Sequence, residues 1–205
     1  MNEPLPNGLK GRFSVVVDAG TLEHVFNFPV AIKNCMELLG EGGHFIGITP
    51  ANNFMGHGFY QFGPELLFSV FSPQNGFEMV KLIICEDFED AQWYEVGRPK
   101  GGIAGRVTLT NHRPTYLMCI ARRLAGLREP FLSTPQQSDY HDAWSHRIEP
   151  KPQKVARKNR TAKLFKSARN TLGGISGVRN LVRNLRYLAE PRFPKRDYTP
   201  LDPLE

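Results

Sequence analysis

Apolar residues in the first fifty positions form two patterns. One is the continuous run typical of buried strands, and the other is the spacing typical of a helix. Residues 13–18 form a β-branched run with almost no polar alternation, as in a parallel strand buried on both faces. After Pro29, which suits a first helical turn, apolar residues recur at helical spacing: Val30, Ile32, Cys35, Met36, Leu38 and Leu39. Three glycines then end the helix, and residues 44–49 form a second apolar run that Pro50 closes. Residues 13–50 are therefore predicted to be a βαβ unit.

The pattern beyond this unit predicts a loop, a helix and an antiparallel strand pair. Residues 51–63 are rich in glycine and aromatic residues and read as a loop, and Pro64 begins a short helix. Apolar runs at 77–85 and 115–121 are predicted to pair as antiparallel strands. The residues between these two runs look irregular, apart from a strand-like piece at 106–109.

Charge divides the chain into an acidic body and a basic tail. Residues 1–146 hold 11 Lys and Arg against 15 Asp and Glu, whereas residues 147–196 hold 15 against 2. Amphipathic basic helices are predicted at about 155–172 and 176–189, separated by a Gly-Gly pair. We therefore predict three parts: an α/β domain over 1–128, a linker over 129–153 and a basic helical tail over 154–205.

Composition argues for a cytoplasmic protein. No apolar stretch reaches the roughly 18 residues of a membrane-spanning helix, and the N-terminus lacks the charged and apolar regions of a signal peptide. The cysteines, at 35, 85 and 119, each fall in an apolar segment without metal-ligand spacing, so we expect reduced core residues.

The loop after the first strand is the best candidate for a binding site, because open α/β sheets bind ligands at the carboxyl ends of their strands. Gly20 permits a close approach of a ligand to the backbone, and Thr21 offers a hydroxyl group. The alternative is an ordinary strand-to-helix connection in which Asp18 or Thr21 caps a turn.

A family resemblance adds to this interpretation. The run D-x-G-T-L-E-H-V, an amphipathic helix, L-L-x-x-G-G-H-F-I and a strand ending in proline resemble the second half of class I S-adenosylmethionine-dependent methyltransferases. The resemblance covers about residues 10–123. It implies a partial Rossmann-like sheet of about four strands with flanking helices, in which the last two strands form the closing antiparallel pair.

The resemblance also implies a cofactor and its contacts. S-adenosylmethionine would lie against Asp18, Gly20, Thr21 and Leu22. The family's glycine-rich loop and the acidic residue that holds the ribose belong to earlier strands, and neither is found in this sequence. We therefore expect the carboxyl-terminal portion of such a domain, with a partner chain as one way to complete the sheet.

Glu23 and His24 have three possible roles. A histidine of near-neutral pKa suits the removal of a proton from a methyl acceptor. Some relatives, among them the ubiquinone-pathway O-methyltransferases, bind a divalent metal through a related E-x-x-E-H run. Gly20 replaces the first glutamate of that run, and His57 or Asp18 could substitute only if the fold brings them close. We therefore assign no metal ligand, and the third role is a hydrogen-bonded structural pair.

The loop at 56–62 would adjoin the acceptor substrate in this family. His57 lies between two glycines, and the aromatic residues after it, including Tyr60, could form an apolar wall with a polar tip. The alternative is that these aromatics cover the sheet edge while His57 faces water. We take His24, His57 and Tyr60 as the candidate catalytic residues.

Two functions from different classes follow. The first is methyl transfer from S-adenosylmethionine to a small-molecule or sugar-like acceptor. The second is a catalytically inactive module that binds a partner chain, or an anionic membrane, through its basic tail. Residues 154–196 suit an anionic membrane or a lipid-linked substrate better than nucleic acid, although they could also form a solvated face.

Overall fold

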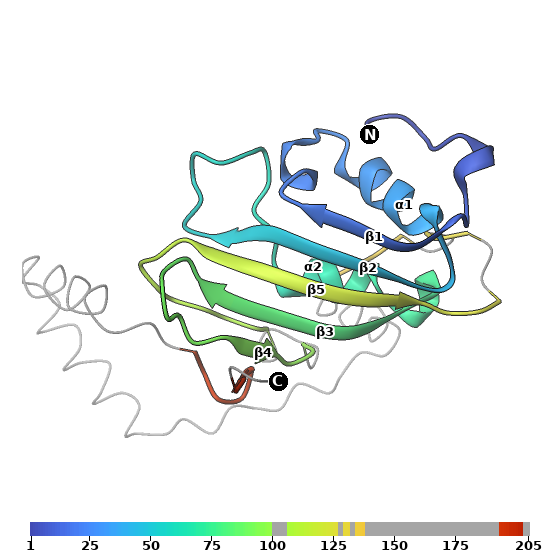
Figure 1. Cartoon of the computed structure of the whole chain (residues 1–205). Helices are drawn as coiled ribbons and strands as arrows, with labels where there is room; N and C mark the ends of the chain where they lie inside the picture. The colour runs from blue at the N-terminus through green and yellow to red at the C-terminus, as the bar shows by residue number, and fades with distance from the viewer. Residues whose placement is uncertain (100–105, 127–128, 132–133, 138–192, 203–205) are drawn as a thin grey trace, which may run out of the picture.

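The structure is a mixed α/β fold built on one six-stranded, mostly antiparallel sheet (Figure 1). It is a computed structural model and describes residues 1–99, 106–126, 129–131, 134–137 and 193–202. The strand order is β1-β2-β5-β3-β4-β6. The strands are β1 (Phe13–Ala19), β2 (Leu39–Asn52), β3 (Phe77–Glu86), β4 (Tyr94–Val96), β5 (Thr115–Arg123) and β6 (Tyr198–Pro200).

The predicted βαβ unit is confirmed. Strands β1 and β2 are parallel neighbours, and helix α1 (Phe28–Leu38) connects them. Strand β2 is longer than predicted at both ends, and Pro50 lies inside it, opposite Tyr116. Proline lacks only the donor, and the Pro50 carbonyl still accepts a hydrogen bond from the Phe62 N–H at 2.8 Å.

The predicted antiparallel pairing of the third and fourth long strands is also confirmed. Strand β5 lies between β2 and β3 and is antiparallel to both. The short helix α2 (Pro64–Val70) precedes β3, as predicted. The prediction of a strand at 106–109 is wrong; instead, the three-residue β4 pairs with β3. Strands this short have too few apolar positions for a period to show in the sequence.

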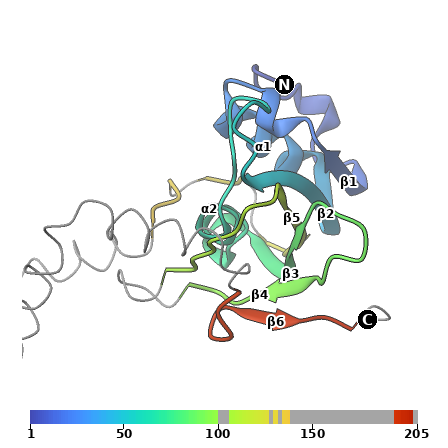
Figure 2. The same ribbon diagram turned by 90° about the vertical axis from the view of Figure 1, so that its left-hand side faces the viewer.

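Both helices cover the same face of the sheet (Figure 2). Alternate residues of β2 and β5 are buried on this face, among them Phe45, Leu117 and Cys119. They join one core with the apolar sides of α1 and α2. Phe71, just after α2, stacks on Phe45 with 4.9 Å between ring centroids, which closes the core below the helices.

Strand β1 forms one edge of the sheet, so the prediction that it is buried on both faces is wrong. Val15 is 49% exposed and Val17 is 62% exposed, so this edge of the sheet is apolar. Within the described part of the chain, no strand pairs with the free edge of β1. Its outward N–H and C=O groups remain available to another strand.

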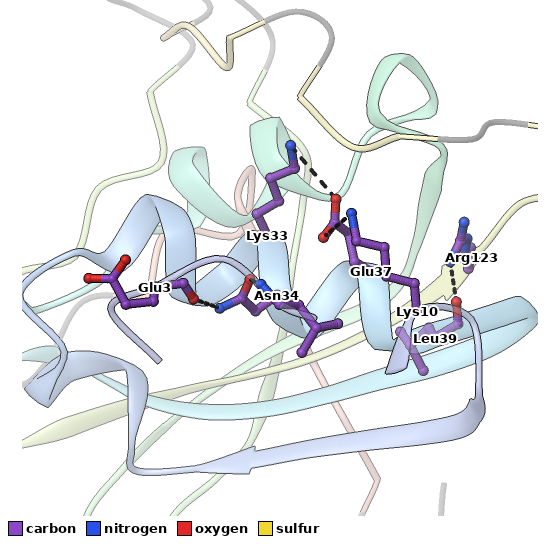
Figure 3. A network of polar contacts seen from close by, with 8 residues as sticks. Glu3, Lys10, Lys33, Asn34, Glu37, Leu39 and Arg123 are labelled. Atoms are coloured by element: carbon purple, nitrogen blue, oxygen red, sulfur yellow. Dashed lines mark hydrogen bonds and ion pairs between the residues drawn. The ribbon is translucent and has the colours of Figure 1, made fainter. Parts of the chain in front are cut away.

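The first twelve residues pack along α1 (Figure 3). Asn34 accepts a hydrogen bond from the Leu5 N–H at 2.9 Å and donates one to the Glu3 carbonyl at 2.8 Å. Lys10 and Lys33 both lie near the carboxylate of Glu37, at 3.1 and 3.7 Å. These contacts hold the segment that enters β1.

The described chain also includes the 3₁₀ turns η1 (Asn7–Leu9), η2 (Leu22–His24) and η3 (Pro73–Asn75).

The far end of the chain returns to the sheet through β6, which pairs with β4. Tyr198 is buried there beside Tyr94 and Phe193, whose rings stack at 4.1 Å. This strand was not predicted and falls within 154–205, where the sequence suggests a helical tail. The two helices predicted at about 155–172 and 176–189 lie outside the described residues, as does most of the linker over 129–153.

The three cysteines are buried free thiols, as expected. Burial raises the pKa of both Cys35 and Cys119 to about 12, which keeps both sulfurs protonated and unreactive at neutral pH. Among the described residues, no helix has the length and apolar character needed to cross a membrane.

Candidate functional site

The candidate site lies where the two parallel strands end. The loop after β1 and the loop after β2 begin at the same end of the sheet, because β1 and β2 are parallel neighbours and their carboxyl ends lie together. The first loop contains the turn η2, with Glu23 and His24, and the second contains His57. Side chains that are more than thirty positions apart in the chain can therefore meet here.

Asp18 ends β1 and supports the turn of the first loop. Its carboxylate is 4% exposed and receives hydrogen bonds from the backbone of Leu22 and from Thr21. Burial raises the pKa of this carboxyl above its ordinary value, and the negative charge of Glu23 adds to the shift, while these hydrogen bonds oppose it. Asp18 is therefore placed to stabilise the turn of the first loop.

The other residues predicted to contact the cofactor divide into two groups. Gly20 and Thr21 are exposed at the surface of the loop, whereas Leu22 is 2% exposed and belongs to the core. Gly20 has a φ of +89°, a conformation that side chains rarely adopt. Only Gly20 and Thr21 thus present accessible groups to a ligand.

The second loop is bound directly to the first through a backbone carbonyl. The N–H groups of Phe59 and Tyr60 donate to the carbonyl oxygen of Glu23 at 2.7 and 3.2 Å. Gly58, with a φ of +72°, lies so close that an added Cβ would be 2.8 Å from the same oxygen. Glycine is therefore required at position 58 for the two loops to make this contact.

This contact brings three ionisable side chains together around Glu23. Its Oε1 atom lies 3.4 Å from Nε2 of His57 and 3.8 Å from Nε2 of His24. The two imidazole rings meet edge to face, with 4.9 Å between their centroids. Glu23 itself is 1% exposed, whereas each histidine side chain is about half exposed. The site thus has a buried carboxylate below and two accessible imidazoles above.

The buried carboxylate of Glu23 is only partly satisfied. Its Oε2 atom has no hydrogen-bond partner among the residues that the structure describes. Within the same residues, its ion-pair partners are the two histidines alone. A buried carboxylate without full pairing costs free energy unless a proton or a cation compensates its charge.

Tyr60 links the second loop to the end of the first loop. Its hydroxyl donates to the backbone carbonyl of Phe26 at 2.6 Å, and its ring stacks on Phe62 at 6.0 Å. The bond joins the second loop to the end of the first. Tyr60 therefore holds the loops together, and its hydroxyl proton is already engaged.

A buried polar network fixes the start of the second loop. Asn53, with a left-handed φ of 59°, donates to the side-chain oxygen of Asn111 at 2.9 Å and to the Arg113 carbonyl at 2.8 Å. Asn111 in turn donates to Glu86 at 2.8 Å and to Thr115 at 2.5 Å. These bonds connect the loop to the ends of β3 and β5.

The sequence pointed to two of the three residues that meet. His24 and His57 were candidates, and the structure places their rings in contact. Glu23 was weighed with His24 as a metal-binding or structural pair but was not taken as a catalytic residue, and it occupies the centre of the cluster. Its position N-terminal to a histidine was the available signal; no local pattern showed that its backbone would also bind the second loop.

Comparison with protein-family models, with curated proteins and with solved structures gave no match to this chain. The resemblance to class I methyltransferases therefore stays a prediction from the sequence motifs.

Proposed function

We propose that the chain takes part in methyl transfer from S-adenosylmethionine to a small-molecule or sugar-like acceptor, and that the two loops around Glu23 form the acceptor side. The observation that carries the proposal is the convergence of His24 and His57 on a buried carboxylate, at the edge where parallel strands end. This edge is the usual ligand-binding position in open α/β sheets.

The strand arrangement supports the proposal. The motif resemblance implies a βαβ unit followed by a closing antiparallel pair. Strands β1 and β2 with helix α1 form such a unit, and β3 and β5 form an antiparallel pair. The finer assignment, a partial Rossmann-like methyltransferase sheet, is part of this proposal.

The chemistry of the cluster suits removal of a proton from an acceptor hydroxyl. An accessible imidazole can accept this proton while the hydroxyl oxygen attacks the methyl carbon. Glu23 lies close enough to stabilise the imidazolium that forms, in the way that a buried carboxylate supports a catalytic histidine. Of the two histidines, His57 lies closer to Glu23. Tyr60 would act by positioning the loop.

The residues available for the cofactor fit it only in part. S-adenosylmethionine would supply the methyl group on a sulfonium centre. Gly20 and Thr21 are exposed and can contact it through backbone and hydroxyl groups, whereas Asp18 and Leu22 face the interior. The chain's own contribution would be to position the acceptor in line with the methyl group.

Calorimetric titration of the purified chain with S-adenosylmethionine, in buffer containing EDTA, tests the proposal. Saturable binding at micromolar concentration would support a cofactor role for this chain, and absence of binding would contradict it. Transfer of a radiolabelled methyl group to a panel of hydroxylated small molecules would then be measured. One of the two histidines is the base, and its replacement, by His24→Ala or by His57→Ala, should lower kcat by about 10²-fold. His44→Ala, in the middle of β2, is the matched control.

The exposed edge of β1 favours a second candidate function, binding of a partner chain. Val15 and Val17 leave apolar surface beside unpaired backbone groups, which suits the addition of another strand. In this case the chain would serve as a cofactor-free interaction module. Binding of S-adenosylmethionine by the chain alone would argue against it.

The basic segment 154–196 provides the remaining partner proposal, an anionic membrane surface or a lipid-linked substrate. It holds 13 of the chain's 26 Lys and Arg residues against one acidic residue, and this charge would attract anionic headgroups. Nearly all of it lies outside the described residues, so the proposal rests on charge alone. This proposal implies a cytoplasmic protein that binds at the cytoplasmic surface of a membrane.

A further inference from the structure

The three side chains at the loop junction have the composition and spacing of a metal-binding site. Glu23, His24 and His57 each offer one ligand atom, and these atoms lie within 4.8 Å of one another. Around a tetrahedral zinc ion, ligand atoms about 2.0–2.1 Å from the metal are about 3.4 Å apart. The two measured distances from Glu23 to the histidines, 3.4 and 3.8 Å, already approach this value.

The unsatisfied carboxylate is an independent indication of a cation. Glu23 is almost fully buried, and its Oε2 atom has no hydrogen-bond partner among the described residues. The same residues include no Lys or Arg in an ion pair with it. A divalent ion bound at Oε1 would neutralise the buried negative charge, whereas neutral histidines cannot.

The two loops already hold the ligands near this geometry. The hydrogen bonds from Phe59 and Tyr60 to the Glu23 carbonyl fix the second loop against the first. His57 therefore stays beside Glu23 without help from a bound ion. The half-exposed histidines leave a path for an ion from solvent, and a set of three protein ligands leaves a coordination position open.

We infer that Glu23, His24 and His57 bind one divalent transition-metal ion, and that zinc is the ion that fits them best. Two imidazoles and one carboxylate are a ligand set that suits zinc, whereas magnesium and calcium prefer oxygen ligands alone. The inference concerns binding by the chain itself and does not depend on methyl transfer. Binding would occupy the imidazole nitrogens, so that a metal-loaded chain could not use either histidine as a base.

Zinc titration of the whole chain, purified without a histidine tag, tests the inference. A chromogenic chelator would compete for zinc in the absence of S-adenosylmethionine, and cobalt would be added in parallel as a spectroscopic probe. We expect one zinc per chain at micromolar or tighter affinity, and visible absorption bands of cobalt in a site of low coordination number. Glu23→Gln and His57→Ala should each weaken zinc binding at least about tenfold.

Two controls separate this site from other histidines. His44→Ala alters a histidine on β2, and the double variant His141→Ala with His146→Ala removes the pair nearest the basic segment. Both should bind zinc as the unaltered chain does. Loss of binding in the double variant, with Glu23→Gln unaffected, would overturn the inference, and so would failure of the unaltered chain to bind.

A measurement on the unaltered chain keeps the test valid if a variant does not fold. Imidazole nitrogen resonances in a ¹⁵N NMR spectrum should shift on addition of zinc for two histidines, and paramagnetic cobalt should broaden the same two. If these are not His24 and His57, the inference is wrong. Because zinc binding is measured without the cofactor, and cofactor binding in EDTA, failure of one proposal leaves the other intact.

Discussion

At the scale of single residues, two buried acidic side chains lie at the carboxyl ends of the parallel strands β1 and β2. Asp18 and Glu23 are 4% and 1% exposed, and each has one oxygen without a hydrogen-bond partner among the described residues. Burial raises the pKa of Asp18, and the nearby negative charge of Glu23 adds to this shift. Buried acidic groups with a shifted pKa are common in functional sites.

Asp18→Asn should reveal this shift through pH. Because the folded pKa of Asp18 lies above the unfolded value of 3.8, the folded state holds its proton more tightly. Stability is therefore lost as pH rises from the unfolded pKa through the folded pKa, and the loss persists above it. The variant has no such proton, so its free energy of unfolding relative to the unaltered chain should increase from pH 3.5 to pH 7.

Urea denaturation of both proteins at several pH values provides the measurement. Titrating groups that do not interact with Asp18 contribute equally to the two proteins and cancel in the difference. A difference that stays constant with pH would contradict the raised pKa of Asp18.

At the scale of elements, the site depends on the docking of one loop against another. The loop after β2 is fixed at its start by Asn111 and farther along by the Glu23 carbonyl. The second contact requires the left-handed glycine at 58, while Gly56 has open space around it and no such backbone conformation. The two glycines beside His57 therefore have different roles.

Gly58→Ala should disrupt this docking, whereas Gly56→Ala should not. The added methyl group at position 58 would meet the Glu23 carbonyl at 2.8 Å on a strained backbone. We expect a loss of about 1–3 kcal/mol in the free energy of unfolding for Gly58→Ala. Gly56→Ala should stay within about 0.5 kcal/mol of the unaltered protein.

Chemical denaturation measures both variants, and zinc titration of the same samples extends the comparison to the site. Equal stabilities for the two variants would mean that the loop does not need the contact at Glu23.

At the scale of the whole molecule, the two edges of the sheet differ. One edge is the short strand β6, brought from the end of the described chain to cover β4. The other is the longer β1, whose free side presents apolar residues and pairs with no strand in the part of the chain that the structure describes. The molecule thus has one protected edge and one that favours association.

Val17→Lys should weaken self-association or partner binding at β1. A charged side chain on an edge strand opposes the addition of another strand. Where the chain associates, we expect the apparent dissociation constant to rise about tenfold, which corresponds to about 1.4 kcal/mol. Sedimentation velocity over a range of concentrations measures this effect.

Val80→Lys is the control, because Val80 is similarly exposed, at 50%, but lies on β3, at the register shift between Met79 and Lys81, rather than on β1. If both variants reduce association equally, general surface hydrophobicity rather than the β1 edge is responsible.

The sequence by itself determined the elements that have a clear period. Apolar runs at 13–18, 44–49, 77–85 and 115–121 predicted the four long strands, and Pro29 with its helical stripe predicted the first helix. Such patterns are local, because each reports only which face of its own element is buried. The loop motifs and the family resemblance, rather than any period, suggested His24 and His57 as candidate catalytic residues.

Only the tertiary structure decided which residues meet. The edge position of β1, the pairing of β4 with β6 and the central place of Glu23 depend on contacts between segments far apart in the chain. Docking of the second loop on the Glu23 carbonyl required a left-handed Gly58, a backbone feature that the sequence permits but does not specify. The docking of the second loop on the Glu23 carbonyl brings His57 beside the buried carboxylate of Glu23, next to His24.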